Sequence, residues 1–231
     1  MATLKQFTDR VRMYVGGIPE LTMREFVIEA AREFCEKSLY LRKDTAVQDI
    51  VSGSSFYTPT AIADLDIVAA IRVEDSTKIV DPRSEDQLDN EWPKLNWRYP
   101  YYSTGTYLST PWRTMTGPQA VFYYHPDVNT IRLVPVPDTT KTGGLFIRIA
   151  AKPSRTATTI DDLLYNEWLD EIARGAVGLL QRIDNRPWTS VRSADRHLKY
   201  FENGYNEARS RVNRSNNRNT KGIGRSRAYY R

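Results

Sequence analysis

The chain has few of the residues on which disulfide frameworks and common metal sites depend. Its 231 residues include one cysteine, Cys35, and two histidines, His125 and His197. A single cysteine excludes an internal disulfide and a cysteine-rich zinc site. Neither histidine belongs to an HExxH or Cys/His pattern, so we expect no metal site. Cys35 lies among apolar residues and is predicted to be a small buried group rather than a nucleophile.

Signatures of the common enzyme classes are also missing. The chain has no GxxxxGK[ST] and no GxSxG, and its only Gly-x-Gly, at 222–224, follows no predicted strand. Carboxylates in one predicted helix are the remaining catalytic candidates, but they alternate with apolar residues, as on an ordinary solvated helix face. We therefore predict a protein that is not an enzyme and uses no cofactor. These carboxylates are Asp161, Asp162, Glu167, Asp170 and Glu171.

Long apolar runs are absent. No segment approaches the ~20 apolar residues of a membrane span, and the N-terminus lacks the apolar core of a signal peptide. We expect a soluble protein that is made in a cytosol and contacts no membrane.

Acidic residues are absent from the last 21 positions, 211–231, which we call the basic arm. The arm holds six arginines and one lysine, whereas the other 210 residues hold 26 basic and 28 acidic groups. Its polar composition cannot bury enough apolar surface to fold alone. Nucleic acid and an acidic protein surface are both open as its partner. The chain also has 14 tyrosines and five tryptophans, residue types that are enriched in contact surfaces.

Helical periodicity occurs at both ends of the chain, and shorter strand patterns lie between them. The helix at 20–38 is expected to begin with a capping box of Thr22 and Glu25. Gly175 and Gly178 would let another helix approach closely. The segment from Trp92 to Trp112 is expected to be a long aromatic loop, and a hairpin is expected to turn near His125 to Asp127. The four predicted helices cover residues 4–15, 20–38, 160–183 and 189–212.

This pattern predicts an α+β fold class, an antiparallel helical bundle from the N- and C-terminal helices with a β-rich insertion and an extended basic C-terminal tail. The expected divisions are 1–44 for the N-terminal helices, 45–158 for the β-rich insertion, 159–212 for the C-terminal helices and 213–231 for the tail. The predicted core residues between front and back helices are Ile172, Ala176, Leu180, Leu198, Phe201 and Tyr205.

Several segments resemble the head-to-tail adaptor proteins of tailed bacteriophages, some of which are called tail tubular protein A. The resemblance lies in the acidic start of the helix at 160–183, its Trp168-to-Ala176 core, the Pro187-Trp188 break and the Ala208-Arg209 pair that ends the last helix. The segments 30–35, AAREFC, and 132–138, RLVPVPD, are also similar to this family.

The resemblance implies a structural virion protein at the neck, assembled in the host cytoplasm. Such adaptors form a ring, commonly of twelve subunits, beneath the portal protein, and present a platform to tail or nozzle proteins. DNA passes through the channel without sequence-specific binding. The arm is then expected to dock on the portal, with its cations on acidic groups and its tyrosines in an apolar groove. The expected docking residues are Arg211, Arg214, Arg218, Lys221, Arg225, Arg227, Tyr229, Tyr230 and Arg231.

Two other classes of function stay open from the sequence. One is a nucleic-acid-binding module that uses the basic arm and the aromatic loop. The other is a carbohydrate-active enzyme of the phage tail, for which the sequence offers no defined acid–base pair.

Overall fold

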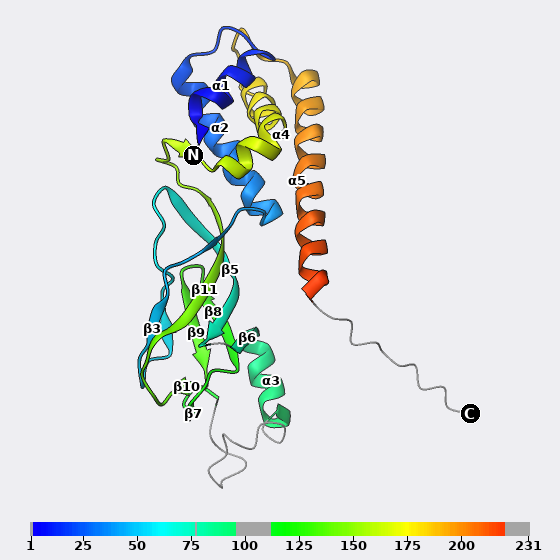
Figure 1. Ribbon diagram of the computed structural model, residues 1–231. Coiled ribbons are helices and arrows are strands. Elements are labelled where there is room, and N and C mark those ends of the chain that lie inside the picture. The colour runs from blue at the N-terminus through cyan, green and yellow to red at the C-terminus, as the bar shows by residue number, and fades with distance from the viewer. Residues whose placement is uncertain (1, 77, 96–111, 220–231) are drawn as a thin grey trace, which may run out of the picture. The chain divides into compact units, whose positions relative to one another are not determined.

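The computed structural model describes residues 2–76, 78–95 and 112–219, with the side chains of 91–95 and 215–219 left out. The chain divides into two compact units (Figure 1). The helical unit combines Met1–Leu41 with Pro153–Arg231, and the sheet unit is Arg42–Lys152. The four divisions expected from the sequence stay a prediction.

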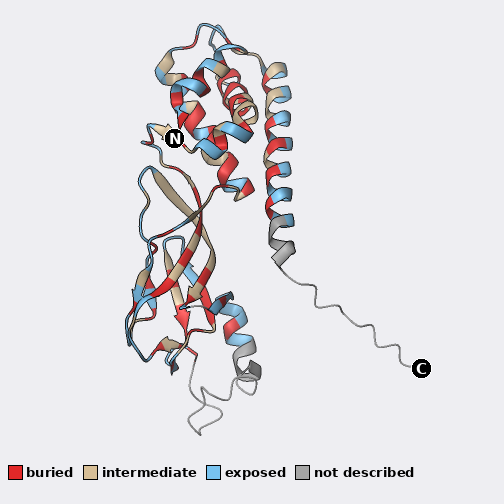
Figure 2. Cartoon of the chain, viewed as in Figure 1, coloured by how far each residue is buried: buried red, intermediate tan, exposed pale blue. Residues whose placement is uncertain are grey.

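The helical unit is built on four helices and one short strand pair. Helix α4 packs against α1, α2 and α5, and α2 also contacts α1 and α5. Buried residues line the inner sides of these helices (Figure 2). The helices are α1 (Leu4–Arg12), α2 (Glu20–Ser38), α4 (Asp162–Gln181) and α5 (Val191–Asn219). The strands are β1 (Ala2–Thr3) and β12 (Thr159–Ile160), which pair antiparallel with Ala2 opposite Ile160.

Local sequence explains where these helices begin. The amide oxygen of Gln6 accepts a hydrogen bond from the Thr3 backbone N–H at 3.0 Å, at the start of α1. The Asp161 carboxylate accepts one from the Leu163 N–H at 3.0 Å, at the start of α4. The predicted capping box of α2 is wrong, because this helix begins two residues earlier, after Pro19.

Close packing of α4 on α5 depends on glycine. A Cβ added to Gly175 would lie 2.6 Å from the ring of Phe201, and one added to Gly178 would lie 2.6 Å from Leu198. The expectation that these glycines admit a neighbouring helix is therefore confirmed. Of the six predicted core residues, four are buried, whereas Leu198 and Tyr205 are only half-buried.

The sheet unit contains an eight-stranded sheet that curls into a half-barrel. Its strand order is β2-β11-β5-β6-β8-β9-β4, with β3 also paired to β11. Neighbours β6 and β8 run parallel, and β7 and β10 form a separate parallel pair. The unit's strands are β2 (Arg42–Asp44), β3 (Gln48–Ile50), β4 (Phe56–Tyr57), β5 (Leu65–Asp75), β6 (Lys78–Pro82), β7 (Thr116–Gly117), β8 (Phe122–Asp127), β9 (Thr130–Val134), β10 (Val136–Pro137) and β11 (Lys141–Pro153).

One helix, α3 (Glu85–Leu95), also belongs to the sheet unit. Leu88 of this helix packs in a buried cluster with Trp112, Phe122, Tyr124 and Val134. The Trp112 indole N–H donates to Asp89 of α3 at 2.7 Å. At least this ring of the expected aromatic loop is therefore buried against the sheet unit, whereas residues 96–111 lie outside the described residues.

The predicted fold class, an antiparallel helical bundle with a β-rich insertion, is wrong. The described residues form a mixed structure of five helices and a large curled sheet. The sequence pattern predicted short separate strands. In the structure, β5 and β11 have 11 and 13 residues and pair with strands that are distant in the sequence. Long twisted strands that pair non-locally curl into one sheet, and helical periodicity contains no information about such pairing.

Two boundaries also differ from expectation. The extended tail was expected from 213, but α5 continues as a helix to Asn219. The hairpin of β8 and β9 turns at Val128 and Asn129 rather than at 125–127, and the Asn129 N–H donates to the Asp127 carboxylate at 2.8 Å. Asn, Ser and Arg are compatible with a helix, so α5 continues beyond Val212, its last apolar residue.

Candidate docking site at the end of helix α5

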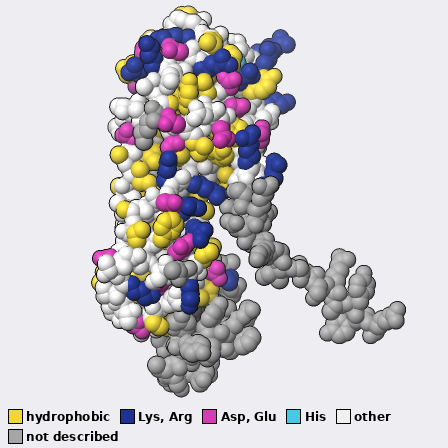
Figure 3. Space-filling view, in the orientation of Figure 1, with side chains coloured by type: hydrophobic (Ala, Val, Ile, Leu, Met, Phe, Trp, Pro, Cys, Tyr) yellow, Lys and Arg dark blue, Asp and Glu magenta, His cyan; other side chains and the backbone are white. Residues whose placement is uncertain are grey.

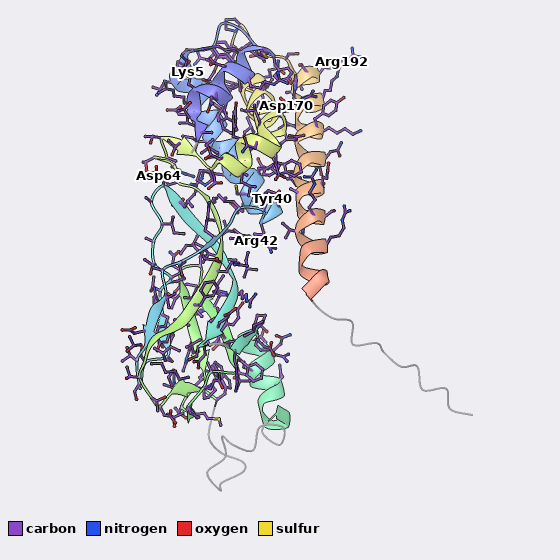
Figure 4. All side chains as sticks on the ribbon, viewed as in Figure 1. Lys5, Tyr40, Arg42, Asp64, Asp170 and Arg192 are labelled. Atoms are coloured by element: carbon purple, nitrogen blue, oxygen red, sulfur yellow. The ribbon has the colours of Figure 1, made fainter. Side chains whose placement is uncertain are left out.

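A kink in α4 creates the surface on which the end of α5 lies. Trp168 has non-helical backbone angles, φ −134° and ψ 18°, inside α4. Its indole is buried and packs 5.3 Å from the ring of Phe34 and 5.5 Å from that of Tyr40, measured between centroids. Phe34 belongs to α2, and Tyr40, labelled in Figure 4, lies just after the end of this helix. The kink thus presents an aromatic platform next to the end of α2.

Arg211 of α5 is held on this platform. Its guanidinium carbon lies 4.7 Å from the centroid of Trp168, within cation–π distance. The same guanidinium donates to Glu207 at 2.7 Å and to Glu167 at 3.3 Å. Glu167 also accepts a hydrogen bond from the Tyr40 hydroxyl at 2.6 Å. We call Tyr40, Glu167, Trp168, Glu207 and Arg211 the Arg211 anchor.

Electrostatics within the anchor favour the charged form of Arg211. The hydrogen bond that Arg211 donates to Glu207 raises the pKa of Arg211, and the negative charge of Glu167 acts in the same direction. Burial and the hydrogen bond with Glu167 raise the pKa of Tyr40. The anchor therefore keeps a charged guanidinium and a neutral phenol at neutral pH.

The anchor lies at the first residue of the basic arm. Val212 is the last buried residue of α5 among those whose side chains are described. Arg214 is exposed and has no ion pair within the described part of the chain. Arg218 lies on the last helical turn. The other six predicted docking residues, Lys221, Arg225, Arg227, Tyr229, Tyr230 and Arg231, lie outside the described residues.

Sequence reasoning grouped Arg211 with the docking residues, but the structure binds this side chain internally. The sequence did not predict the partners of Arg211, which include Tyr40, Glu167 and Trp168. A signal existed, because Glu207 and Arg211 are spaced i and i+4, the spacing at which helical charges pair. No sequence signal indicated the contact with Trp168, since the kink in α4 follows from packing rather than from local sequence.

Three of the five candidate carboxylates, Asp161, Glu167 and Asp170, have structural roles. Asp170 forms an ion pair with Arg10 of α1 across a groove of about 520 Å³. This hydrogen bond raises the pKa of Arg10. Asp161 caps α4, and Glu167 belongs to the Arg211 anchor. The groove is lined mostly by charged and amide side chains, and the described residues contain no group of three or more His, Cys, Asp or Glu that could hold a metal ion.

His197 differs from expectation. It was expected to be solvated, but it is half-buried, and its ring lies 5.4 Å from that of Tyr14. Burial lowers the pKa of His197, and the nearby Arg174 and Arg196 lower it further. The sequence placed His197 off the apolar seam of α5 correctly, but Tyr14, in the segment after α1, packs against its ring.

Comparison with known proteins identifies the family. No curated protein matches the chain. Within the described residues, no helix is long and apolar enough to cross a membrane. The family model of the SU10 adaptor protein matches residues 2–223, nearly the whole chain. The resemblance to bacteriophage adaptors that the sequence suggested is thereby confirmed, and the chain belongs to the SU10 adaptor protein family, a family of structural phage adaptors.

Proposed function

We propose that this protein is the head-to-tail adaptor of a phage neck and that it is not an enzyme. Subunits form a ring, of twelve copies, beneath the portal protein, and the ring continues the DNA channel toward tail or nozzle proteins. Membership of the adaptor family supports contacts with portal and tail proteins. DNA passes without sequence-specific binding, because the chain outside the arm has a small excess of acidic groups.

The basic arm is the part of the subunit that docks on the portal. The observation that supports this role is the Arg211 anchor, which fixes the root of the arm while Arg214 beyond it is exposed and unpaired among the described residues. A fixed root makes the arm a local partner for one site on the portal, and several arms acting on one ring add avidity. Arg211 is then a positioning residue, and docking begins at Arg214.

A protein partner explains the composition of the arm better than DNA does. Tyr229 and Tyr230 give the arm an apolar end, which a groove on a protein can bury and a phosphate backbone cannot. Arginine also binds carboxylates with two parallel hydrogen bonds. The arm therefore fits an acidic groove with an apolar floor.

Deleting residues 215–231 tests this role. We expect the truncated chain to keep its far-UV circular dichroism and thermal midpoint, because the buried seam of α5 ends at Val212. We expect it to lose binding to purified portal rings in a pull-down or sedimentation assay. Arg214→Glu should weaken portal binding about tenfold, whereas Arg209→Glu, an exposed change on the same helix, should not.

Binding to duplex DNA is measured as the second part of this test. Normal attachment of the truncated chain to the portal, with a loss of DNA affinity, would show that the arm is a nucleic-acid-binding segment. In that case wild-type binding to DNA should fall steeply with salt, with a log–log slope of up to about −5 for the six cations from Arg214 onward.

A further inference from the structure

The outward face of α5 carries a row of cations that nothing in the described structure neutralises. Arg192, Arg196 and Lys199 are exposed and are spaced i, i+4 and i+7, so they project from one side of the helix. That side is opposite to the seam of Ala194 and Phe201, which packs against the helical unit. Figure 4 labels Arg192 at the first turn of α5. We call the three cations the basic stripe.

The basic stripe is not part of an internal salt-bridge network. None of its members forms an ion pair within the described residues, although other charges on α5 do. Asp195, for example, pairs with Arg182 at 2.9 Å. Figure 3 shows Lys and Arg side chains gathered along the edge of the helical unit where α5 lies. A row of like charges without partners is typical of a surface that meets an acidic one.

The same unit carries an acidic row of matching geometry on α2. Glu25, Glu29 and Glu36 are exposed at i, i+4 and i+11, opposite to the buried face of this helix, and Glu33 lies between them. We call these four residues the acidic stripe. Glu25 and Glu29 form no ion pair within the described residues. Both stripes repeat about once per helical turn, or ~5.4 Å, so they can be laid against one another.

The two stripes lie on different helices that flank α4. Helix α4 packs against both α2 and α5, and it lies between them in Figure 1. Glu25 and Glu29 are exposed on the side of α2 opposite to its buried face, and the basic stripe is exposed on the side of α5 opposite to its seam. These charges therefore do not neutralise each other within one chain. They can do so between two chains, the acidic stripe of one copy against the basic stripe of the next.

We propose that α2 and α5 form the lateral contact between neighbouring copies of this chain. The contact is heterologous, since each copy contributes a different surface to each neighbour, and such contacts repeat around a ring. The inference rests on the proposed adaptor function only in taking the partner to be a second copy. DNA is the less suitable occupant, because it would use the basic stripe and leave the acidic stripe without a role.

Charge reversal on either stripe tests the contact. The acidic-stripe variant carries Glu25→Lys, Glu29→Lys and Glu36→Lys, so that stripe becomes net basic. The basic-stripe variant carries Arg192→Glu, Arg196→Glu and Lys199→Glu, so that stripe becomes acidic. The full chain is studied by sedimentation velocity up to about 200 µM at ~50 mM and ~500 mM salt, since exposed pairs are screened over this range. We expect the wild type to self-associate at low salt and less at high salt. Each variant alone should associate at least about tenfold more weakly.

Mixing the two variants provides the decisive measurement. One variant has two basic stripes and the other has two acidic stripes, so each repels itself but complements the other. An equimolar mixture should therefore recover the association of the wild type. Arg209→Glu serves as the matched control, because this residue is exposed on α5 outside the basic stripe and its reversal should change nothing. Circular dichroism and thermal midpoints establish that each variant is folded.

Three results would overturn the inference. These are a wild type that stays monomeric under all conditions, variants that associate as the wild type does, and a mixture that fails to recover association. Loss of duplex DNA binding in the basic-stripe variant, with self-association unchanged, would assign the stripe to DNA instead. Portal binding is measured separately, so loss of docking with intact self-association counts against the proposed function alone.

Discussion

At the residue scale, His197 lies in surroundings that disfavour its charged form. Its Nδ1 is buried and has no hydrogen-bond partner among the described residues. Tyr14 of the segment after α1, Arg174 of α4 and Arg196 of α5 are the titratable groups that face it. Protonation would therefore place a third positive charge between two arginines, in a site that water reaches poorly.

This environment makes stability depend on pH near neutrality. Burial, together with the two arginines, lowers the pKa of His197 in the folded state, so the unfolded chain binds the proton more readily. Stability is therefore fully present above the unfolded pKa of about 6.5 and is lost as pH falls below it. We expect the urea midpoint of the wild type to fall between pH 7.5 and 5.5.

His197→Gln isolates this effect, because glutamine has no charge to gain. The variant should show a smaller fall in urea midpoint over the same pH range. The exposed His125 is present in both proteins and cancels from the comparison. Hydrogen bonds from Arg148 and Arg113 lower the pKa of Asp44 and of Asp89 below the ordinary range of an aspartate, so these carboxylates respond only at more acidic pH. Equal pH dependence in both proteins would contradict the argument.

At the element scale, the contact of α4 with α5 is set by three glycines. Gly175 and Gly178 meet the side chains of Phe201 and Leu198, and Gly204 of α5 meets Glu171 of α4 at 2.5 Å from its missing Cβ. These contacts let the two helix backbones approach closely. Because these contacts hold α5 over residues 198–204, they also set the direction in which the helix continues to the Arg211 anchor.

Gly175→Ala should destabilise the protein even though alanine is the better helix former. The new methyl group would overlap the Phe201 ring, which costs about 1–3 kcal/mol, whereas the gain in helix propensity is about 1 kcal/mol. Phe201→Ala should cost about 3–5 kcal/mol because the ring is buried. In the Phe201→Ala background the sign should reverse, and Gly175→Ala should stabilise by up to about 1 kcal/mol.

Urea unfolding of the four chains of this double-mutant cycle measures these values. Gly16→Ala is the matched control, since a Cβ added there would have no other atom within 4 Å. It should be close to neutral. A destabilising Gly175→Ala in both backgrounds would show that the Phe201 ring is not what limits the approach of the helices.

Sequence reasoning succeeded for these elements wherever local chemistry decides. Spacing predicted a seven-residue apolar seam on α5, of which four residues are buried, two are half-buried and Val191 is exposed. The buried residues are Ala194, Phe201, Ala208 and Val212, and the half-buried ones are Leu198 and Tyr205. The small residues of α4 indicated a close helix neighbour. Reasoning from the sequence failed for the curled sheet, because strands as distant as β2 and β11 pair, and for the Arg211 anchor, because it depends on a kink that packing imposes at Trp168.

At the scale of the whole molecule, the chain crosses between its two compact units only twice, near residues 41–42 and 152–153. Each unit has its own buried core. In the sheet unit, the fully buried Asp75 of β5 accepts from Lys141 of β11 at 2.6 Å and from the Ala120 N–H at 2.8 Å. Asp75 therefore ties two long strands and the approach to β8 together without involving the helical unit.

Two substitutions, one in each unit, should separate their stabilities. Asp75→Ala leaves Lys141 and the Ala120 N–H without their partner, which costs about 3 kcal/mol, and Phe201→Ala removes a core ring from the helical unit. In hydrogen exchange, we expect Asp75→Ala to accelerate amides of residues 42–152 and Phe201→Ala to accelerate those of 2–41 and 153–212. Arg155→Ala, an exposed change, should accelerate neither. Acceleration throughout the chain by either substitution would mean that the units unfold as one cooperative body. Separate responses would mean that each unit can unfold while the other keeps its fold.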